Sequence, residues 1–507
     1  MTYILAHDVG TRGNKAALVT PEGRIVGSVF EPYPTHYPRP LWAEQDPADW
    51  WRAITQSTRR LLEEQAVSPA DVLAVTFAPQ MLGVVPVDAA GQPLRPGIIW
   101  LDGRAVDEAR AVMRKVGGPE IFARIVGVAL TGKDVLPKLL WLRRNEPQVY
   151  ARAAALLDVG GYLLLRASGQ MVYEWTAASV TGLFDFTRKT WDAFLMRLFG
   201  MEREKFPPTV RSTERVGGLT KEAAEACGLR EGTPVIAGAG DAPAAAVGSG
   251  AVGEGDGHIS LGTSGWVGVV TAGRVTGKRG IATIQSADPA KLFLVAETET
   301  AGACLDWAAR ALYAAEPGAE VFARMDAEVA ACEAGAGGLI FTPWMYGERC
   351  PIADESVRST FLNLSPLHTR PQMTRAIYEG VAYNLRWMLE SIHELYGMHP
   401  DPVRVIGGGA KGAPWLQIIA DVTGRTMEAV PQPQHAAAVG AALVAAVGMG
   451  VYPSFEALKP LIRPEHTMTP NPAPRSRYDE LYAAYRQVYR ALRGLYKRLN
   501  RPTEMPS

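Results

Sequence analysis

The chain has 507 residues, of which 47% are hydrophobic and 21% charged, and its 52 basic side chains balance 52 acidic ones. Single hydrophobic cores rarely grow beyond about 250–300 residues, so this composition predicts two large folded domains and excludes a disordered chain. A net charge of zero without a long basic run argues against a protein that binds nucleic acid or a membrane surface through bulk electrostatics.

The four cysteines are scattered and form no CxxC pair, which argues against a zinc ribbon and a disulfide framework. Reduced thiols in the cytoplasm are the simpler interpretation. The apolar run Tyr3–Ala6 is too short for a signal peptide, and the Ala- and Gly-rich stretch 436–450 is too short to span a bilayer. We therefore expect a cytoplasmic enzyme of two domains, with no nucleic-acid or membrane partner.

The first elements along the chain are those of a β-hairpin followed by an α/β segment. The turn Gly10–Gly13 lies between two short apolar runs. A helix is expected from Pro47 to about Gln65, because Asp46 can cap it and proline is favoured at the first helical position. The expected strands of this region are 3–6, 16–19, 24–30, 72–77 and 83–87.

The second half of the chain repeats this pattern. The turn Gly262–Gly265 again lies between two apolar runs. The segment 403–409 looks like a copy of the segment 234–241, since in both an apolar strand enters a glycine turn ahead of a helix. The repetition predicts two similar α/β halves with a ligand cleft between them, and the glycine-rich run 248–257 is the expected boundary.

Two turns carry residues suited to a nucleotide. Backbone amides in tight turns cradle phosphate oxygens, and Thr and Ser hydroxyls add donors. The first turn offers Asp8 and Thr11, and an Asp can hold the hydrated Mg²⁺ that accompanies a nucleoside triphosphate. The second turn offers Gly262, Thr263 and Ser264. One such turn in each half predicts that the two halves hold a triphosphate between them.

Asp241 follows an apolar strand in a glycine turn and stands at the head of a helix. This position suits a helix N-cap. The same carboxylate, facing a cleft, can accept the proton of a sugar hydroxyl. Phosphoryl transfer depends mainly on positioning and charge neutralisation, so one carboxylate base with Mg²⁺ is chemically sufficient.

Five segments, in order along essentially the whole chain, resemble the FGGY family of carbohydrate kinases: 8–18, 237–250, 259–265, 346–364 and 407–424. The resemblance implies an α/β fold of two duplicated actin/hexokinase-like (ribonuclease H-like) domains with an interdomain cleft. It also implies transfer of the γ-phosphoryl group of ATP, with Mg²⁺, to a hydroxyl of a small sugar. Homodimers are common in the family, so the resemblance allows a homodimer, although the sequence does not give the oligomeric state.

Within the family, segments 42–51, 80–83, 96–105 and 137–145 are most similar to the xylulokinase branch. This implies a ketopentose such as D-xylulose as acceptor, with another ketose, a polyol or a sugar acid as the alternative. By resemblance, Asp241 is the catalytic base and Asp8 organises the Mg²⁺. The residues expected at the nucleotide are Asp8, Thr11, Gly262, Thr263, Ser264, Gly302, Gly408, Gly409 and Lys411. Those expected at the sugar are Gln80, Met81, Leu82, Trp100, Asp102 and Asp241.

Three positions depart from the family pattern. Leu82 stands where the xylulokinase branch carries a His that would hydrogen-bond a sugar hydroxyl, so a hydroxyl facing Leu82 would lose its partner. His7 stands in place of an apolar residue and His435 in place of a Glu, and neither is assigned a role.

We expect residues 1–250 to bind most of the sugar and supply the base, 251–460 to bind most of the ATP, and 461–507 to pack back as helices.

Two functions of other classes fit part of the pattern. A dinucleotide-dependent dehydrogenase rests on Gly407, Gly409 and Gly412, with Glu428 about 20 residues further on. A non-catalytic sugar sensor or chaperone-like ATPase would use the same fold. A sensor has no need of Asp8, Asp241 and both turns together, which favours the kinase.

Overall fold

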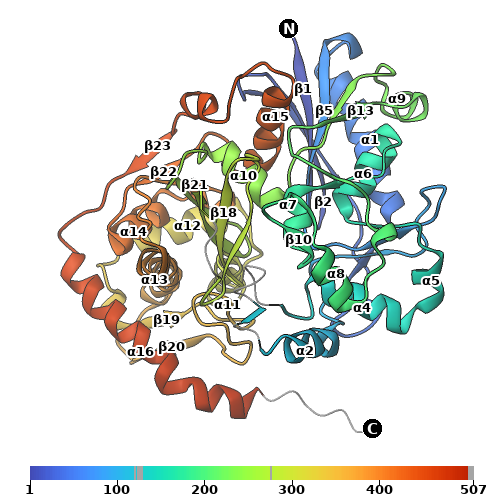
Figure 1. Cartoon of the computed structure of the whole chain (residues 1–507). Helices are drawn as coiled ribbons and strands as arrows, with labels where there is room; N and C mark the ends of the chain where they lie inside the picture. Colours follow the sequence, from blue (N-terminus) through green and yellow to red (C-terminus); the bar gives the residue numbers. More distant parts are fainter. Residues whose placement is uncertain (119–120, 123–129, 274–276, 501–507) are drawn as a thin grey trace.

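The computed structural model of the chain describes residues 1–118, 121–122, 130–273 and 277–500. Two large mixed β-sheets form the cores of two lobes that lie side by side in Figure 1. Residues 501–507, the end of the expected C-terminal unit, lie outside the described part. Within the described residues, no helix is both long enough and apolar enough to cross a membrane.

The sheet of the first lobe has the strand order β13-β14-β5-β1-β2-β3. Its strands are β1 (Tyr3–Val9), β2 (Gly13–Val19), β3 (Ile25–Pro32), β5 (Val72–Pro79), β13 (Arg215–Gly218) and β14 (Pro234–Ile236). Alternate residues of β1 face opposite sides of the sheet, as the period of a strand requires. Leu5 packs in the core beneath the helices of the outer face, whereas Ile4 and Ala6 pack against two helices between the lobes. Both faces are therefore covered.

The sheet of the second lobe has the order β17-β18-β16-β15-β21-β22-β23. Its strands are β15 (Gly257–Leu261), β16 (Gly265–Thr271), β17 (Ile281–Gln285), β18 (Leu292–Thr298), β21 (Val403–Ile406), β22 (Met427–Ala429) and β23 (His466–Met468). Short strands form two-stranded pairs elsewhere: β4 (Glu44–Gln45), β6 (Val85–Val87), β7 (Gly97–Ile98), β8 (Ala155–Leu157), β9 (Tyr173–Glu174), β10 (Phe184–Asp185), β11 (Thr190–Trp191), β12 (Thr209–Val210), β19 (Ile340–Thr342) and β20 (Thr360–Leu362).

The strand pairings confirm the predicted duplication. β1 pairs antiparallel with β2 and parallel with β5, and β15 pairs antiparallel with β16 and parallel with β21. One detail of the prediction is wrong. The segment 403–409 contains β21, which occupies the place that β5 has in the first sheet, whereas the segment 234–241 contains β14, which corresponds to β22. The two segments share a local strand–glycine pattern but hold different positions.

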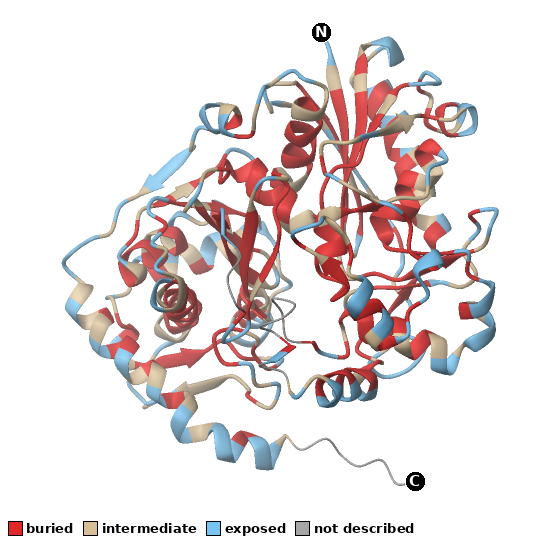
Figure 2. Cartoon of the chain, in the orientation of Figure 1, coloured by how far each residue is buried: buried red, intermediate tan, exposed pale blue. Residues whose placement is uncertain are grey.

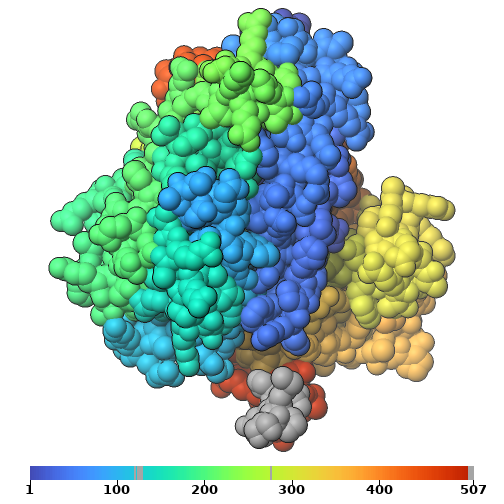
Figure 3. All heavy atoms as spheres, turned by 90° about the vertical axis from the view of Figure 1, so that its right-hand side faces the viewer, coloured from blue at the N-terminus to red at the C-terminus, as the bar shows by residue number. Residues whose placement is uncertain are grey.

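Helices cover both sheets. They are α1 (Pro47–Glu64), α2 (Val106–Lys115), α4 (Val135–Asn145), α5 (Pro147–Arg152), α6 (Val159–Ser168), α7 (Trp175–Ser179), α8 (Ala193–Phe199), α9 (Lys221–Cys227), α10 (Asp241–Ser249), α11 (Gly302–Tyr313), α12 (Ala319–Ala330), α13 (Arg370–Tyr396), α14 (Ala413–Thr423), α15 (Ala436–Gly448) and α16 (Arg475–Leu499). The expected helix after Asp46 is confirmed as α1, and Asp46 caps it by accepting a hydrogen bond from Ala48 N. In the view of Figure 3, blue-to-green residues of the first half of the chain cover most of the surface.

The helices α10 and α15 pack closely between the lobes (Figure 1). An added Cβ at Gly248 would lie 1.8 Å from Ala436 O, and one at Gly440 would lie 1.7 Å from Ala244 O. Only glycine fits at these two contacts. Although α15 lies between β22 and β23 of the second sheet in sequence, it packs on β1 and β2 of the first sheet together with α10.

The C-terminal helix α16 packs on α13. Tyr478, Leu481 and Tyr485 recur at helical spacing along α16 and are buried in the core of the second lobe. The Arg375 guanidinium of α13 donates to Tyr478 Oη over 2.9 Å. Figure 2 shows α13 and both sheets buried, whereas the outer side of α16 is exposed.

Candidate active site

Asp241 is the first residue of α10, directly after a tight turn. The turn needs glycine at position 238, where φ is +74° and an added Cβ would lie 2.0 Å from Phe77 O. The N-cap is Gly240 and not Asp241, so the predicted capping role is displaced by one residue. Asp241 Oδ1 accepts a hydrogen bond of 2.8 Å from Ala242 N, and Oδ2 accepts none from the described residues. One carboxylate oxygen thus stays available at the head of the helix.

The surroundings of Asp241 favour its protonated form. Burial, followed by the negative charge of nearby Asp8, raises the pKa of Asp241 to about 7, and Glu297 of β18 adds to the rise. Lys15 opposes these effects and also forms an ion pair with Asp8, with Lys15 Nζ 3.0 Å from Asp8 Oδ2. The structure therefore brings the two predicted acidic residues together, next to a lysine that the sequence analysis missed. A carboxyl group with a pKa near neutrality suits proton transfer at physiological pH.

The buried side chain of Gln45 connects the predicted residues Thr11 and Gln80, and Trp100 joins them through Thr11. Trp100 Nε1 donates to Thr11 Oγ1 over 2.8 Å, and Gln45 Nε2 donates to Thr11 O over 2.7 Å. Gln80 Nε2 in turn donates to Gln45 Oε1 over 2.8 Å. We call Gly10–Gly13 and Gly262–Gly265 the first and second phosphate turns, because they are the turns expected to bind phosphate. The first phosphate turn and the expected sugar residues Gln80 and Trp100 thus form one polar network. Gln45 itself was missed, although it stands in the segment 42–51 that carried part of the family resemblance.

Met81 and Leu82 lie beside the turn of Asp241. An added Cβ at Gly240 would lie 2.5 Å from Met81 Sδ, so Met81 covers this turn. Leu82 has φ +61°, which is unusual for a bulky residue. Its carbonyl oxygen accepts a hydrogen bond of 3.0 Å from Lys138 Nζ, which also donates to Ile99 O over 2.9 Å. Burial lowers the pKa of Lys138 to about 7. This second missed lysine joins the chain segments of Leu82 and Trp100.

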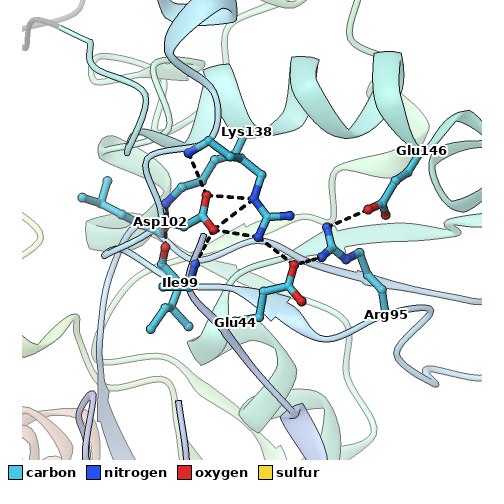
Figure 4. Close-up of polar contacts among 9 residues, drawn as sticks. Glu44, Arg95, Ile99, Asp102, Lys138 and Glu146 are labelled. Carbon is cyan, nitrogen blue, oxygen red and sulfur yellow. Dashed lines mark hydrogen bonds and ion pairs between the residues drawn. The ribbon is translucent and has the colours of Figure 1, made fainter. Parts of the chain in front are cut away.

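Asp102 lies in a separate ionic network (Figure 4). Its carboxylate accepts hydrogen bonds from the Arg104 guanidinium, at 2.7–3.0 Å, and from Ala43 N, at 2.6 Å. Arg104 also pairs with Glu44 over 2.6 Å, and its guanidinium lies over the Trp42 ring. Asp102 and Arg104 are fully buried. In the structure both oxygens of Asp102 accept hydrogen bonds that fix the loop after Trp100, and its contact with the sugar stays a prediction.

The second phosphate turn rests on the first turn of α11. Gly302 N donates to Gly262 O over 2.8 Å, and Ala301 N donates to Thr263 O over 2.9 Å. An added Cβ at Gly302 would lie 2.6 Å from Gly262 O, which explains the glycine there. The Thr263 side chain is exposed and that of Ser264 is half-buried. The predicted residues Gly262, Thr263, Ser264 and Gly302 are therefore one compact unit.

The glycine turn after β21 lies against the same unit. An added Cβ at Gly407 would lie 2.6 Å from Leu261 O, directly before the second phosphate turn. Gly408, Gly409 and Lys411 form the single 3-10 turn η4 (Gly408–Lys411) ahead of α14, and Gly408 and Lys411 are exposed. The sheet contains antiparallel strands on both sides of β21 and β22, so the doubly wound parallel sheet of the dehydrogenase alternative is not formed.

The two histidines that depart from the family pattern, His7 and His435, have different surroundings. His7 is fully buried, 3.0 Å from Asn14 Nδ2 and stacked on Phe77, and burial lowers its pKa to about 3. It is a neutral core residue. His435 precedes α15, and its pKa is lowered by burial and then by Lys15, with contributions from Asp8 and Lys411. His435 thus lies where charged residues of the first half, Asp8 and Lys15, and of the second half, Lys411, affect its pKa.

Comparisons with known proteins agree with this geometry. Residues 3–248 match the N-terminal domain of the FGGY family of carbohydrate kinases, and residues 257–449 match its C-terminal domain. The chain is 31% identical to the xylulose kinase of Escherichia coli, covering 97% of this chain and 98% of that protein. It is 30% identical to the L-xylulose/3-keto-L-gulonate kinase of the same organism, covering 99% of each. The crystal structure of xylulose kinase from Rhodospirillum rubrum is 30% identical, covers 97% of this chain and 99% of that chain, and superposes with a TM-score of 0.89. The chain therefore belongs to the FGGY family of carbohydrate kinases.

Proposed function

We propose that this carbohydrate kinase transfers the γ-phosphoryl group of ATP to a hydroxyl of a ketopentose, with D-xylulose as the first substrate to test. The observation that carries the proposal is the place of Asp241. Its carboxyl heads α10 beside the Asp8–Lys15 pair, and Met81 of the expected sugar residues packs on the turn directly before it. A base next to a phosphate-binding turn is the arrangement that phosphoryl transfer to an alcohol needs.

Each residue has a proposed part in the reaction. Asp241 Oδ2 accepts the proton of the attacking sugar hydroxyl, whose oxygen forms a bond to the γ-phosphorus while the bond to the β–γ bridging oxygen breaks. The products are a sugar phosphate and ADP. Lys15 offsets negative charge where the phosphates gather, and the amides of the two turns donate to phosphate oxygens. Gln80 binds the sugar. Its buried Oε1 has no hydrogen-bond partner among the described residues, so it is free to accept a hydrogen bond from a sugar hydroxyl.

Mg²⁺ fits this site as a partner of the nucleotide. No three acidic, His or Cys side chains among the described residues converge to hold a metal by themselves. Mg²⁺ usually keeps several waters and is held by one or two carboxylates together with substrate phosphates. Asp8 supplies such a carboxylate, and Mg²⁺ bound there would neutralise charge on the phosphates. We therefore propose that Mg²⁺ enters with ATP and that Asp8 holds it.

The choice of D-xylulose rests on relatives. Several proteins about 30% identical over nearly the full length are xylulose kinases. A relative of equal identity is named as acting on L-xylulose and 3-keto-L-gulonate. Leu82 offers the acceptor no hydrogen bond from its side chain, so the stereochemistry of the sugar must be tested directly.

The test is a panel of acceptors with ADP release as the signal. The panel contains D-xylulose, L-xylulose, 3-keto-L-gulonate, erythritol and glycerol at equal concentrations with saturating ATP and Mg²⁺. We expect D-xylulose to have the highest kcat/KM. A higher value for another member would reassign the acceptor but keep the kinase chemistry. An absence of sugar-dependent ADP release with every member would contradict the proposal for this site.

Two further proposals concern organisation. We propose that residues 1–250 bind most of the sugar and 251–460 bind most of the ATP; of the remaining residues, β23 extends the second sheet and α16 packs on the second lobe. We also propose a homodimer, in keeping with the family resemblance. Separate titrations of sugar and ATP check the first proposal, and the mass of the species in solution checks the second.

A further inference from the structure

The short helix α7 places one hydroxyl against the turn that carries Asp241. Thr176 Oγ1 is fully buried and accepts a hydrogen bond of 2.8 Å from Gly240 N. Gly240 is the residue before Asp241 and the N-cap of α10. The Thr176 hydroxyl therefore holds the peptide that immediately precedes the proposed base.

Glu174 sets the direction of this hydroxyl. Its Oε2 accepts from Thr176 Oγ1 and from the backbone N–H of Thr176, at 2.8 Å, and of Ala177, at 3.3 Å. A hydroxyl has one hydrogen, and here that hydrogen points to Oε2 of Glu174. The oxygen of Thr176 is then left to accept from Gly240 N. The buried Glu174 thus prevents the hydroxyl from turning away from Gly238–Gly240, the turn before Asp241, which we call the catalytic turn.

The other side of the turn is closed by packing. Met81 occupies the space beside Gly240, and Phe77 O lies against Gly238. The Gly238 amide donates to Ser212 O over 3.0 Å. Because the turn is enclosed on these sides, loss of the Thr176 bond would leave Gly240 N–H buried without an acceptor. Relief of that unsatisfied donor requires the turn to move, and Asp241 would move with it.

The far end of α7 contacts the second lobe. Ser179 Oγ accepts a hydrogen bond of 3.0 Å from Gln285 N, at the end of β17, and donates to Thr176 O over 2.6 Å. The side chain of Gln285 also accepts from Lys189 Nζ. One helix of five residues therefore contacts the catalytic turn at one end and the second sheet at the other.

From this geometry we propose that Thr176, oriented by Glu174, is a positioning residue that sets the Asp241 carboxylate against the acceptor hydroxyl. The inference rests on the proposed role of Asp241 as the base. A misplacement of about 1 Å can cost about 100-fold in rate, so the effect should fall on the chemical step. Binding of ATP uses other groups and should change little.

Thr176→Val is the direct test, because valine keeps the shape and removes the hydroxyl. We expect kcat to fall by about 10–100-fold, with KM for ATP changed by less than about threefold. Thr176→Ser keeps the hydroxyl and should restore most of the activity.

The matched control is Thr181→Val. Thr181 is equally buried, and its hydroxyl also makes one donated bond, to Ala178 O at 2.6 Å, and one accepted bond, from Leu183 N at 3.1 Å. It does not contact the catalytic turn. Its kcat should stay within about threefold of the wild type. If the valine variants fail to fold, as judged by thermal melting, the smaller pair Thr176→Ala and Thr181→Ala replaces them.

A double-mutant cycle separates this inference from the proposed function. In an Asp241→Asn background there is no base to position, so Thr176→Val should cause little further loss of rate. Equal kcat values for the Thr176 and Thr181 variants would overturn the positioning role. So would a full, additive effect of Thr176→Val in the Asn background. Normal turnover of Asp241→Asn alone would instead overturn the base assignment.

Discussion

The two phosphate turns occupy equivalent places in the duplicated fold but are held by different means. The first turn is fixed by side chains: Tyr33 Oη donates to Gly10 O, and Gln45 and Trp100 bond to Thr11. The second turn is fixed by backbone amides of the adjoining α11. The duplication thus preserved the hairpin geometry while each half acquired its own support.

This difference has a functional consequence. Because Gln45 also bonds to Gln80, and Trp100 is itself an expected sugar residue, the first turn is coupled to the acceptor side of the site. The second turn leaves Thr263 exposed and has no comparable link to those residues within the described chain. We therefore expect substitutions near the first turn to affect both substrates and substitutions in the second turn to affect ATP alone.

The largest expected effect tests whether the base comes from the first half alone. Asp241→Asn keeps the shape and the Ala242 hydrogen bond but removes the ability to take a proton. We expect sugar phosphorylation to fall by roughly 10²–10⁴-fold or more, with the fold and ATP binding retained. Steady-state ADP release and calorimetric titration of ATP measure the two quantities. Near-normal turnover would show that Asp241 is not the base and that the first half does not supply it through this residue.

A substitution at Leu82 tests the acceptor side of the first half. Leu82→His introduces a hydrogen-bonding side chain at a residue with φ +61°, a conformation that His adopts more readily than Leu. We expect kcat/KM for D-xylulose to rise by about 10–100-fold if the new hydrogen bond forms, while KM for ATP stays nearly unchanged.

Leu82→Phe is the control for this change, because it adds a ring of similar shape without a polar nitrogen. An equal gain with Phe would assign the effect to shape. If the wild type already turns over D-xylulose efficiently and the His variant is no better, Leu82 does not set specificity.

How far the sequence predicted these features depends on whether they are local. The helix α1 was foreseen with its cap because Asp46 and Pro47 are adjacent, and the β1–β2 hairpin follows from the turn Gly10–Gly13 between apolar runs. The family motifs also predicted the grouping of Asp8 with Asp241. These signals all lie within a few neighbouring residues or in a recognised motif.

Features that depend on distant parts of the chain were missed or misread. Gln45 gains its role only when Thr11 and Gln80 converge on it, and Trp100 joins this network through Thr11. The pairing of Asp102 with Arg104 was missed because nothing local reveals it, and the sugar-binding role of Asp102 stays a prediction. Likewise, the segments 234–241 and 403–409 have the same strand–glycine pattern, and only the parallel pairing of β21 with β15 shows that they are not equivalent.

A pair of matched valine substitutions tests the comparison of the two turns directly. Thr11→Val removes the acceptor of Trp100 Nε1, so we expect binding of both sugar and ATP to weaken by about 3–10-fold. Thr263→Val removes an exposed hydroxyl from the second turn, and we expect a loss of similar size for ATP only. Isothermal titration of each ligand separately distinguishes the two patterns. A loss confined to the sugar in the Thr263 variant would reverse the assignment of the two halves.

The smallest expected effect concerns the contribution that Glu297, in the second half of the chain, makes to the pKa of Asp241. Asp241 must be ionised to accept a proton, and its pKa is about 7, so kcat/KM for the sugar should fall about tenfold for each pH unit well below 7. Glu297 comes from β18, and its negative charge raises the pKa of Asp241. Glu297→Gln removes that charge, favours the ionised form of Asp241, and should move the acidic limb of the profile to lower pH by a few tenths of a unit.

The control for the charge is Glu299→Gln, because Glu297 and Glu299 each lie 2.5 Å from the Arg349 guanidinium. If the limb moved because Arg349 lost a partner, both variants would show the same displacement. A larger displacement for Glu297→Gln would show that this carboxylate acts on Asp241 across the boundary between the lobes. An unchanged limb in that variant, or a limb moved to higher pH, would contradict this electrostatic link. The base would then owe its raised pKa to burial and to Asp8, both within the first half.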